Sequence, residues 1–136
     1  MHDIHVRKYM TSTPLTIDRH LPLKDAEKLM QEHRIRHLPV MDGDKLVGIV
    51  AAPELSFLAA LAGLDPDRLP VGEVMTRSPY AVAPDADLYQ VTQYFIEHKG
   101  SAAVVVENDK VVGVLTTIDA LRALMDLLAE ARRVLK

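Results

Sequence analysis

The sequence has no cysteine and no tryptophan, and only two of its 136 residues are phenylalanine. Without cysteine the chain forms no disulfides and no thiolate metal sites, which fits an intracellular protein. Few aromatic rings argue against a stacking platform for single-stranded nucleic acid. The net charge is −3 and no basic block stands out. Nucleic acid is therefore not an expected partner.

Long apolar runs are also missing. No run approaches about 18 residues, so we expect no transmembrane helix and no membrane partner. Residues 1–10 have no apolar core, so they do not resemble a signal peptide, and we expect a cytoplasmic protein. Hydrophobic residues make up 49% of the chain and charged residues 26%. This composition is typical of a folded globular protein.

An internal repeat is the main positive feature. A shift of 65 positions aligns residues 6–55 with residues 71–120 without a gap. Identical pairs include Val6/Val71, Met10/Met75, Thr11/Thr76, Pro14/Pro79, Val40/Val105 and Gly48/Gly113. Such a register predicts two copies of one supersecondary unit.

Each copy predicts the order β-α-β-β-α. Short strands are expected at 14–17 and 79–82, each followed by a helix with apolar residues at helical spacing. Two apolar strands follow, joined by tight turns at 43–44 and 108–109. Closing helices are expected at 53–62 and 118–134. The fold class is α/β, with copy one at 1–62, a linker at 63–70 and copy two at 71–136.

One copy alone is marginal for stability, because it has only about 50–60 residues. We therefore expect the two copies to pack sheet to sheet about a pseudo-twofold axis. The stripe on the last helix is expected to pack on the rest of the chain or on a second chain, or to dock a partner protein. It comprises Leu121, Leu124, Met125, Leu128 and Ala131.

The segment "GVLTTID", residues 113–119, carries the most specific chemistry. Thr116 lies where a strand is expected to end and a helix to begin, so unpaired backbone N–H groups there favour an anion. The carboxylate of Asp119 could accept hydrogen bonds from two vicinal ribose hydroxyls. The same two residues also form a capping box pattern. Gly113 would allow close approach of a ligand ring or a neighbouring strand.

These motifs resemble a tandem CBS-domain pair, also called a Bateman module. The doubled "MT" box, "RHLPVMD" and "GVLTTID" carry the resemblance, which extends over about residues 6–125. It implies a homodimer that binds AMP, ADP, ATP or S-adenosylmethionine and regulates a partner protein that the sequence does not identify. It implies no required cofactor. An interaction scaffold that dimerises without ligand is the alternative.

The resemblance also implies the ligand-binding residues. Asp119 would contact the ribose, Thr116 a phosphate, and Ile118 lies between them. Backbone groups at 13–15 would read the adenine, Leu15 and Ile35 would sandwich it, and Arg36 and His37 would face phosphate. The predicted set is Thr116, Asp119, Ile118, Thr13, Pro14, Leu15, Ile35, Arg36 and His37.

A second, weaker cleft is expected from the equivalent positions of the other copy. Its residues would be Glu54, Ser78, Pro79, Tyr80 and Ser101. Ala51 replaces the threonine and Glu54 the aspartate, and Pro53 lacks an N–H. The sequence therefore predicts one competent site and one weak or empty site.

Catalysis and metal binding have little support in the sequence. We find no nucleophile–base pair and no Gly-rich phosphate loop, so we expect no enzymatic activity. His33 and His37 are four residues apart, but three ligands around one open position are not evident. His33 and His98 instead suit the C-terminal ends of their helices.

Overall fold

The structure is a computed structural model and describes residues 3–12, 15–52, 60, 63 and 65–135. The first copy contains η1 (Val6–Lys8), β1 (Ile17–Asp18), α1 (Leu23–His33), β2 (His37–Asp42) and β3 (Lys45–Ala51). The second contains η2 (Val71–Glu73), β4 (Thr76–Arg77), β5 (Ala81–Val82), α3 (Leu88–His98), β6 (Ala102–Glu107), β7 (Lys110–Thr116) and α4 (Thr117–Leu135). The predicted α/β class is confirmed, as are the order β-α-β-β in both copies and the closing helix of copy two. The first closing helix, predicted at 53–62, falls almost entirely outside the described residues.

Helices α1 and α3 form because their apolar residues recur at helical spacing and are buried on one face. α1 buries Leu23, Ala26 and Met30, and α3 buries Leu88, Val91 and Phe95, each 65 positions later. The helices end at Arg34 and Lys99, which have φ of 54° and 52° in the left-handed region. This is a common way to end a helix. The 65-residue register therefore extends to the helix caps.

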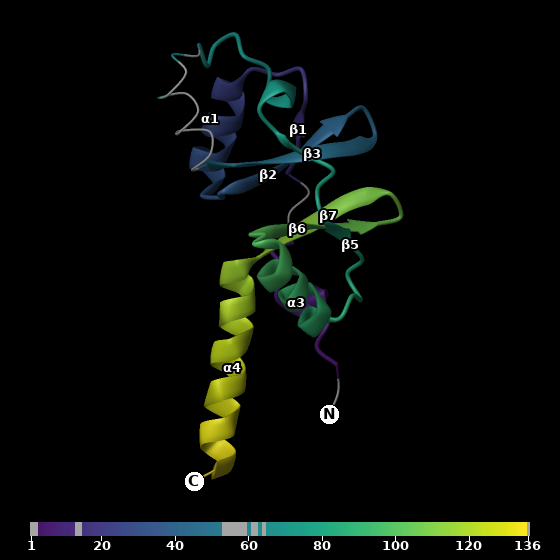
Figure 1. The fold of residues 1–136 in the computed structure, drawn as a ribbon, viewed down its shortest axis with the longest axis vertical. Helices are drawn as coiled ribbons and strands as arrows, with labels where there is room; N and C mark the ends of the chain where they lie inside the picture. Colours follow the sequence, from purple (N-terminus) through teal and green to yellow (C-terminus); the bar gives the residue numbers. More distant parts are fainter. Residues whose placement is uncertain (1–2, 13–14, 53–59, 61–62, 64, 136) are drawn as a thin grey trace. The chain divides into compact units, whose positions relative to one another are not determined.

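The strands form two sheets, shown in Figure 1. One has the order β1-β2-β3-β4 and the other β5-β6-β7. β1 runs parallel to β2, and β5 runs parallel to β6. The two hairpins turn at the predicted positions, where Gly43, Asn108 and Asp109 have positive φ. The three central residues of β2 and of β6 are buried, as expected of continuous apolar strands.

The chain divides into two compact units that differ from the sequence repeats. Residues 1–13, 80–108 and 112–136 form one unit, and residues 14–79 and 109–111 form the other. The cause lies in the opening segment of each copy, which packs with the hairpin of the other copy. Thr11 pairs with Val114 in β7, and Thr76, 65 residues later, pairs with Ile49 in β3.

Both opening segments make equivalent contacts. The amide of Val6 donates to Ala86 O at 2.9 Å, and the amide of Val71 donates to Leu21 O at 2.8 Å. Both valines are fully buried, each in the core of the unit that receives it. Each unit is therefore completed by a segment of the other repeat, and we call these the exchanged opening segments.

The repeated glycine of the second hairpin strand allows this exchange. A Cβ at Gly113 would lie 2.5 Å from Thr11 O, and one at Gly48 would lie 2.4 Å from Met75 Sδ. Real Cβ atoms do not approach other atoms so closely, so a side chain would displace the opening segment. The sequence predicts that Gly113 allows the close approach of a ligand ring or of a neighbouring strand. The structure shows the neighbouring backbone of Thr11 there.

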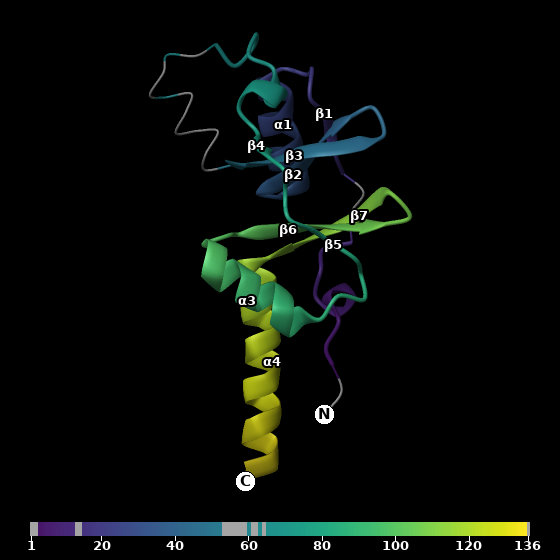
Figure 2. The same cartoon turned by 45° about the vertical axis from the view of Figure 1, so that its right-hand side comes forward.

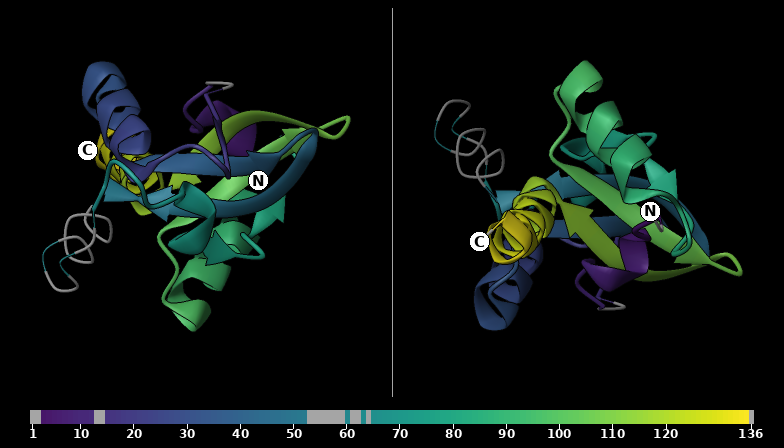
Figure 3. Two further views of the ribbon diagram at one scale, coloured as in Figure 1. Left: turned by 90° about the horizontal axis from the view of Figure 1, so that it is seen from above. Right: turned by 90° about the horizontal axis from the view of Figure 1, so that it is seen from below.

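Helix α4 extends away from its sheet in Figures 1 and 2. In the end-on views of Figure 3, α3 and η1 lie to one side of α4. Its apolar stripe is exposed: Leu121 54%, Leu124 49%, Met125 70% and Leu128 55%. The stripe therefore does not pack on the rest of its own unit, and packing on a second chain or on a partner protein stays a prediction. The helix instead holds its unit through Asp119 and Ala123, which are both buried on the opposite face.

Candidate functional site

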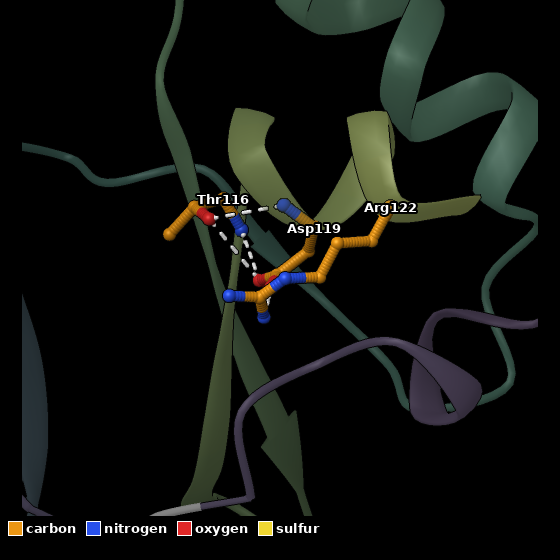
Figure 4. A network of polar contacts seen from close by, with 3 residues as sticks. All are labelled: Thr116, Asp119 and Arg122. Carbon is orange, nitrogen blue, oxygen red and sulfur yellow. Dashed lines mark hydrogen bonds and ion pairs between the residues drawn. The ribbon is translucent and has the colours of Figure 1, made fainter. Parts of the chain in front are cut away.

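The predicted capping box is present where β7 ends at Thr116 and α4 begins at Thr117. The amide of Thr116 donates to Asp119 Oδ2 at 2.8 Å, and the amide of Asp119 donates to Thr116 Oγ1 at 3.3 Å. The Thr116 hydroxyl also donates to Oδ2, at 3.2 Å. Each side chain thus satisfies a backbone donor of the first turn. Figure 4 shows this network.

Asp119 is a buried carboxylate whose two oxygens are both engaged. The residue is 2% exposed, and its Oδ1 accepts a hydrogen bond from Arg122 Nη1 at 3.2 Å. The Arg122 side chain is 66% exposed and reaches back from one turn further along α4. The N-terminal end of a helix favours negative charge, which adds to these donors. A fixed carboxylate therefore lies at the start of α4.

Arg122 was not among the predicted site residues. Its spacing of three residues from Asp119 places the two side chains on one face of a helix, and this signal was visible in the sequence. Spacing alone does not say whether the guanidinium turns toward the carboxylate or toward water. The burial of Asp119 decides it, because a buried carboxylate needs a donor on each oxygen.

The remaining predicted ligand residues lie in different parts of the chain. Ile118 is beside the box and is 56% exposed. Leu15 and Ile35 belong to the other unit, where both are half-buried against its core. Arg36 is exposed at its side chain, and His37 opens β2 and is half-buried. Thr13 and Pro14 lie outside the described residues. The joint role of these residues stays a prediction.

A cavity of about 380 Å³ lies in that other unit, at the C-terminal end of α1. Its lining comprises Glu27, Met30, Gln31, Arg34, Ile35, Arg36 and Ala52. Two predicted ligand residues, Ile35 and Arg36, are therefore at a cavity wall. Ala52 is part of the same lining, and its amide donates to Arg36 O at 2.8 Å.

The residues predicted for the weaker cleft have several different surroundings. Ser78 is exposed with φ of 52°, and the carbonyl of Ser101 accepts from the amide of Thr117 at 3.1 Å. The ring of Tyr80 stacks on Tyr94 at 3.6 Å, and burial raises the pKa of its hydroxyl. Glu54 lies outside the described residues.

His98 occupies the position predicted for it. Its ring stacks on Tyr94 at 3.9 Å, and its Nδ1 lies 3.1 Å from the carbonyl oxygen of Tyr94. The imidazole therefore contacts a carbonyl of the last turn of α3, as expected of a residue that caps a helix end.

The described part of the chain contains no group of three or more His, Cys, Asp or Glu residues arranged to hold a metal ion. Among its helices, none combines the length and the apolar character needed to cross a membrane.

The family of the chain follows from a family model that matches both copies of the repeat. The family model of the CBS domain matches the chain twice, at residues 6–55 and 71–126. The chain belongs to the CBS-domain family. It is a CBS pair, since the two matches coincide with the two copies of the repeat.

Solved CBS pairs match nearly the whole chain. A Vibrio cholerae protein described as an acetoin utilization protein (AcuB) is 34% identical, with a TM-score of 0.78 over 97% of this chain and 98% of its own. The CBS pair of protein MJ0100, solved in complex with 5′-methylthioadenosine and S-adenosyl-L-methionine, is 25% identical. Its TM-score is 0.81 over 92% of this chain and 98% of its own.

Curated relatives include much longer proteins. The A-adding tRNA nucleotidyltransferase of Aquifex aeolicus is 32% identical over 124 residues, which are 90% of this chain but 15% of that protein. Two CBS proteins of Arabidopsis thaliana are likewise matched over only 20% and 21% of their length. The shared part is the CBS pair.

Proposed function

We propose that this CBS pair is a regulatory module that binds an adenosine-containing ligand at the start of α4. Asp119 would accept hydrogen bonds from the ribose hydroxyls, and Thr116 and the first amides of α4 would face a phosphate. The observation that carries the proposal is the buried carboxylate of Asp119 at a helix N-terminus. The MJ0100 pair, with its two adenosyl compounds, supports this ligand class.

The module would act by binding and not by catalysis. A ligand shifts a conformational equilibrium only by as much as its affinity differs between the two conformations. We therefore propose that the ligand favours one arrangement of the module, and that a partner protein senses this arrangement. The module would need no further cofactor for this role.

A titration of AMP, ADP, ATP and S-adenosylmethionine tests the proposal. At about 100 times Kd, a ligand should raise the free energy of unfolding by about 2.7 kcal/mol, seen as a higher Tm. Asp119→Asn should abolish this shift, because it removes the charge and one acceptor. Glu130→Gln, on an exposed part of the same helix, is the matched control. No shift with any of the four compounds at millimolar concentration would overturn the proposal.

The stoichiometry tests the predicted inequality of the two clefts. Ala51 stands where the other copy has Thr116, and an alanine has no hydroxyl to offer a phosphate. We therefore expect calorimetry to give about one ligand per chain. Two equivalent sites per chain would contradict this prediction.

A second candidate function is a scaffold that dimerises without ligand. The exposed stripe of α4 favours it, because its residues Leu121, Leu124, Leu128 and Ala131 follow heptad spacing. Leu135 continues this spacing at the end of the helix. A second copy presents the same stripe, and pairing of the two helices would cover the apolar side chains of both.

A pair of charge-introducing variants tests the scaffold. Leu124→Glu combined with Leu128→Glu should convert a dimer to a monomer in light scattering, while Ala129→Glu, off the stripe, should leave it intact. A monomeric wild-type chain would overturn this candidate. A dimer whose Tm is unchanged by all four adenosyl compounds would favour the scaffold over the ligand-sensing role.

A further inference from the structure

The ion pair between Arg122 and Asp119 presents a problem for any ribose that binds here. A carboxylate binds a vicinal diol through free lone pairs on its oxygens. In this structure Oδ2 already accepts two donors from Thr116, and Oδ1 accepts Arg122 Nη1 at 3.2 Å. The carboxylate itself is only 3% exposed. For two hydroxyls to bind, at least one present donor must leave.

Arg122 is the donor that leaves most readily. The Thr116 donors belong to the cap of α4, and their loss would leave the first turn unsatisfied. The Arg122 side chain is 66% exposed and hydrogen-bonds Asp119 through one nitrogen. An exposed guanidinium on a flexible stem regains water when it moves, so its release has a small cost.

The net cost of release depends on what the ligand offers in return. A neutral nucleoside replaces the guanidinium with hydroxyl donors and gives Arg122 no new anionic partner. A nucleoside 5′-phosphate supplies oxygens that the planar guanidinium can bind in a bidentate manner. The phosphate therefore compensates for the lost ion pair, and the neutral nucleoside does not.

We propose that Arg122 is a specificity-determining residue that exchanges its bond to Asp119 for one to the 5′-phosphate when a nucleotide binds. The site thereby selects nucleoside phosphates over neutral nucleosides. This proposal rests on the proposed function, because it assigns the ligand class of the same site.

Helix α4 offers a matched control for this idea. Arg133 pairs with Glu130 at the same spacing of three residues, but the Glu130 side chain is 57% exposed. Removal of Arg133 deletes the same charge from the same helix without freeing a buried carboxylate. An effect shared by both variants reports net charge, and an effect confined to Arg122 reports the site.

Calorimetric titration of AMP and adenosine into wild type, Arg122→Gln, Arg122→Lys and Arg133→Gln tests the proposal. Wild type and Arg133→Gln should prefer AMP, and Arg122→Gln should reduce that preference about tenfold or more, through weaker AMP binding and unchanged or tighter adenosine binding. Arg122→Lys should keep part of the preference, because it retains the charge.

An unchanged preference in Arg122→Gln, or equal losses for AMP and adenosine, would overturn the role of Arg122 and leave the proposed function standing. Binding of neither compound to wild type at millimolar concentration would also overturn the role of Arg122, whereas the proposed function is decided by the titration of all four adenosyl compounds. Circular dichroism of each variant confirms that the helix is retained before titration.

Discussion

The two copies of the CBS unit share a turn but differ in the side chains placed on it. Thr117 N donates to Ser101 O at 3.1 Å in copy two, and Ala52 N donates to Arg36 O at 2.8 Å at the equivalent place in copy one. The backbone bond is therefore the same with and without a threonine before it. This backbone bond does not depend on Thr116, so the threonine acts through the capping box and not through the bond between the strand and the turn.

The two cores show a second kind of difference. At equivalent positions, Ala26 and Met30 in one core correspond to the larger Val91 and Phe95 in the other. Leu38 corresponds instead to the smaller Ala103. Gains and losses of volume thus occur together within one core, which is how close packing is kept when single residues change.

The largest predicted effect comes from the repeated glycine. Gly113→Ala should destabilise the protein by about 3 kcal/mol, because its Cβ would meet the backbone oxygen of Thr11 at 2.5 Å. Gly48→Ala should cost about 1–2 kcal/mol, because its Cβ would meet the flexible side chain of Met75 and approach the backbone oxygen of Thr76 only to 2.9 Å. Urea unfolding followed by circular dichroism measures both.

Gly100→Ala is the control for these two variants. Its Cβ would lie 3.4 Å from the Phe95 ring, an ordinary contact. A cost for Gly113→Ala no larger than that of Gly100→Ala would mean that the opening segment does not need the glycine.

The next largest effect comes from a substitution that gives copy two the residue of copy one, since Ala51 is the equivalent of Thr116. Thr116→Ala should cost about 1–2 kcal/mol, since it removes the cap and one donor to buried Asp119. Thr117→Ala, the same change one residue on, should cost less than about 0.5 kcal/mol. Equal costs in urea unfolding would show that the capping box contributes nothing beyond the turn.

The smallest effect concerns Tyr9, whose equivalent in copy two is Val74. The Tyr9 hydroxyl donates to Asp126 Oδ2 at 2.6 Å, and this bond to the carboxylate raises the pKa of Tyr9 above 10.0. A raised pKa in the folded state stabilises the fold fully below pH 10, and the contribution is lost as pH rises through the folded pKa.

Tyr9→Phe should therefore lower stability by less than about 1 kcal/mol at pH 8. The difference from wild type should shrink as the pH rises above 10 and Tyr9 loses its proton. Unfolding free energies of both proteins over a pH series from 8 upward measure it. A difference that is independent of pH would exclude the hydroxyl as its source.

Local patterns were sufficient to predict much of this molecule. The capping box of Thr116 and Asp119, the two hairpin turns and the helical faces follow from residues close in sequence, and the structure confirms them. The exchanged opening segments could not be predicted in the same way. Met10-Thr11 and Met75-Thr76 are identical, so the pattern fits either hairpin equally well. Only the folded chain decides which hairpin each one joins.

Burial limited the prediction of the candidate site. The sequence shows Arg122 three residues after Asp119, but not that Asp119 is buried and needs a partner. The sequence also shows the stripe of α4, but it does not show that the rest of the unit leaves this stripe uncovered.

The exchanged opening segments also set an order on folding during synthesis, because the chain emerges from the ribosome N-terminus first. The unit at 14–79 has nearly all of its residues once position 79 has been made. Val6 has to wait for residues 80–136 before it can be buried, a delay of several seconds at about 5–20 residues per second. The first residues to be translated are thus among the last to pack, and a nascent chain of which only the first 79 residues have left the ribosome would expose Val6 without the unit that buries it.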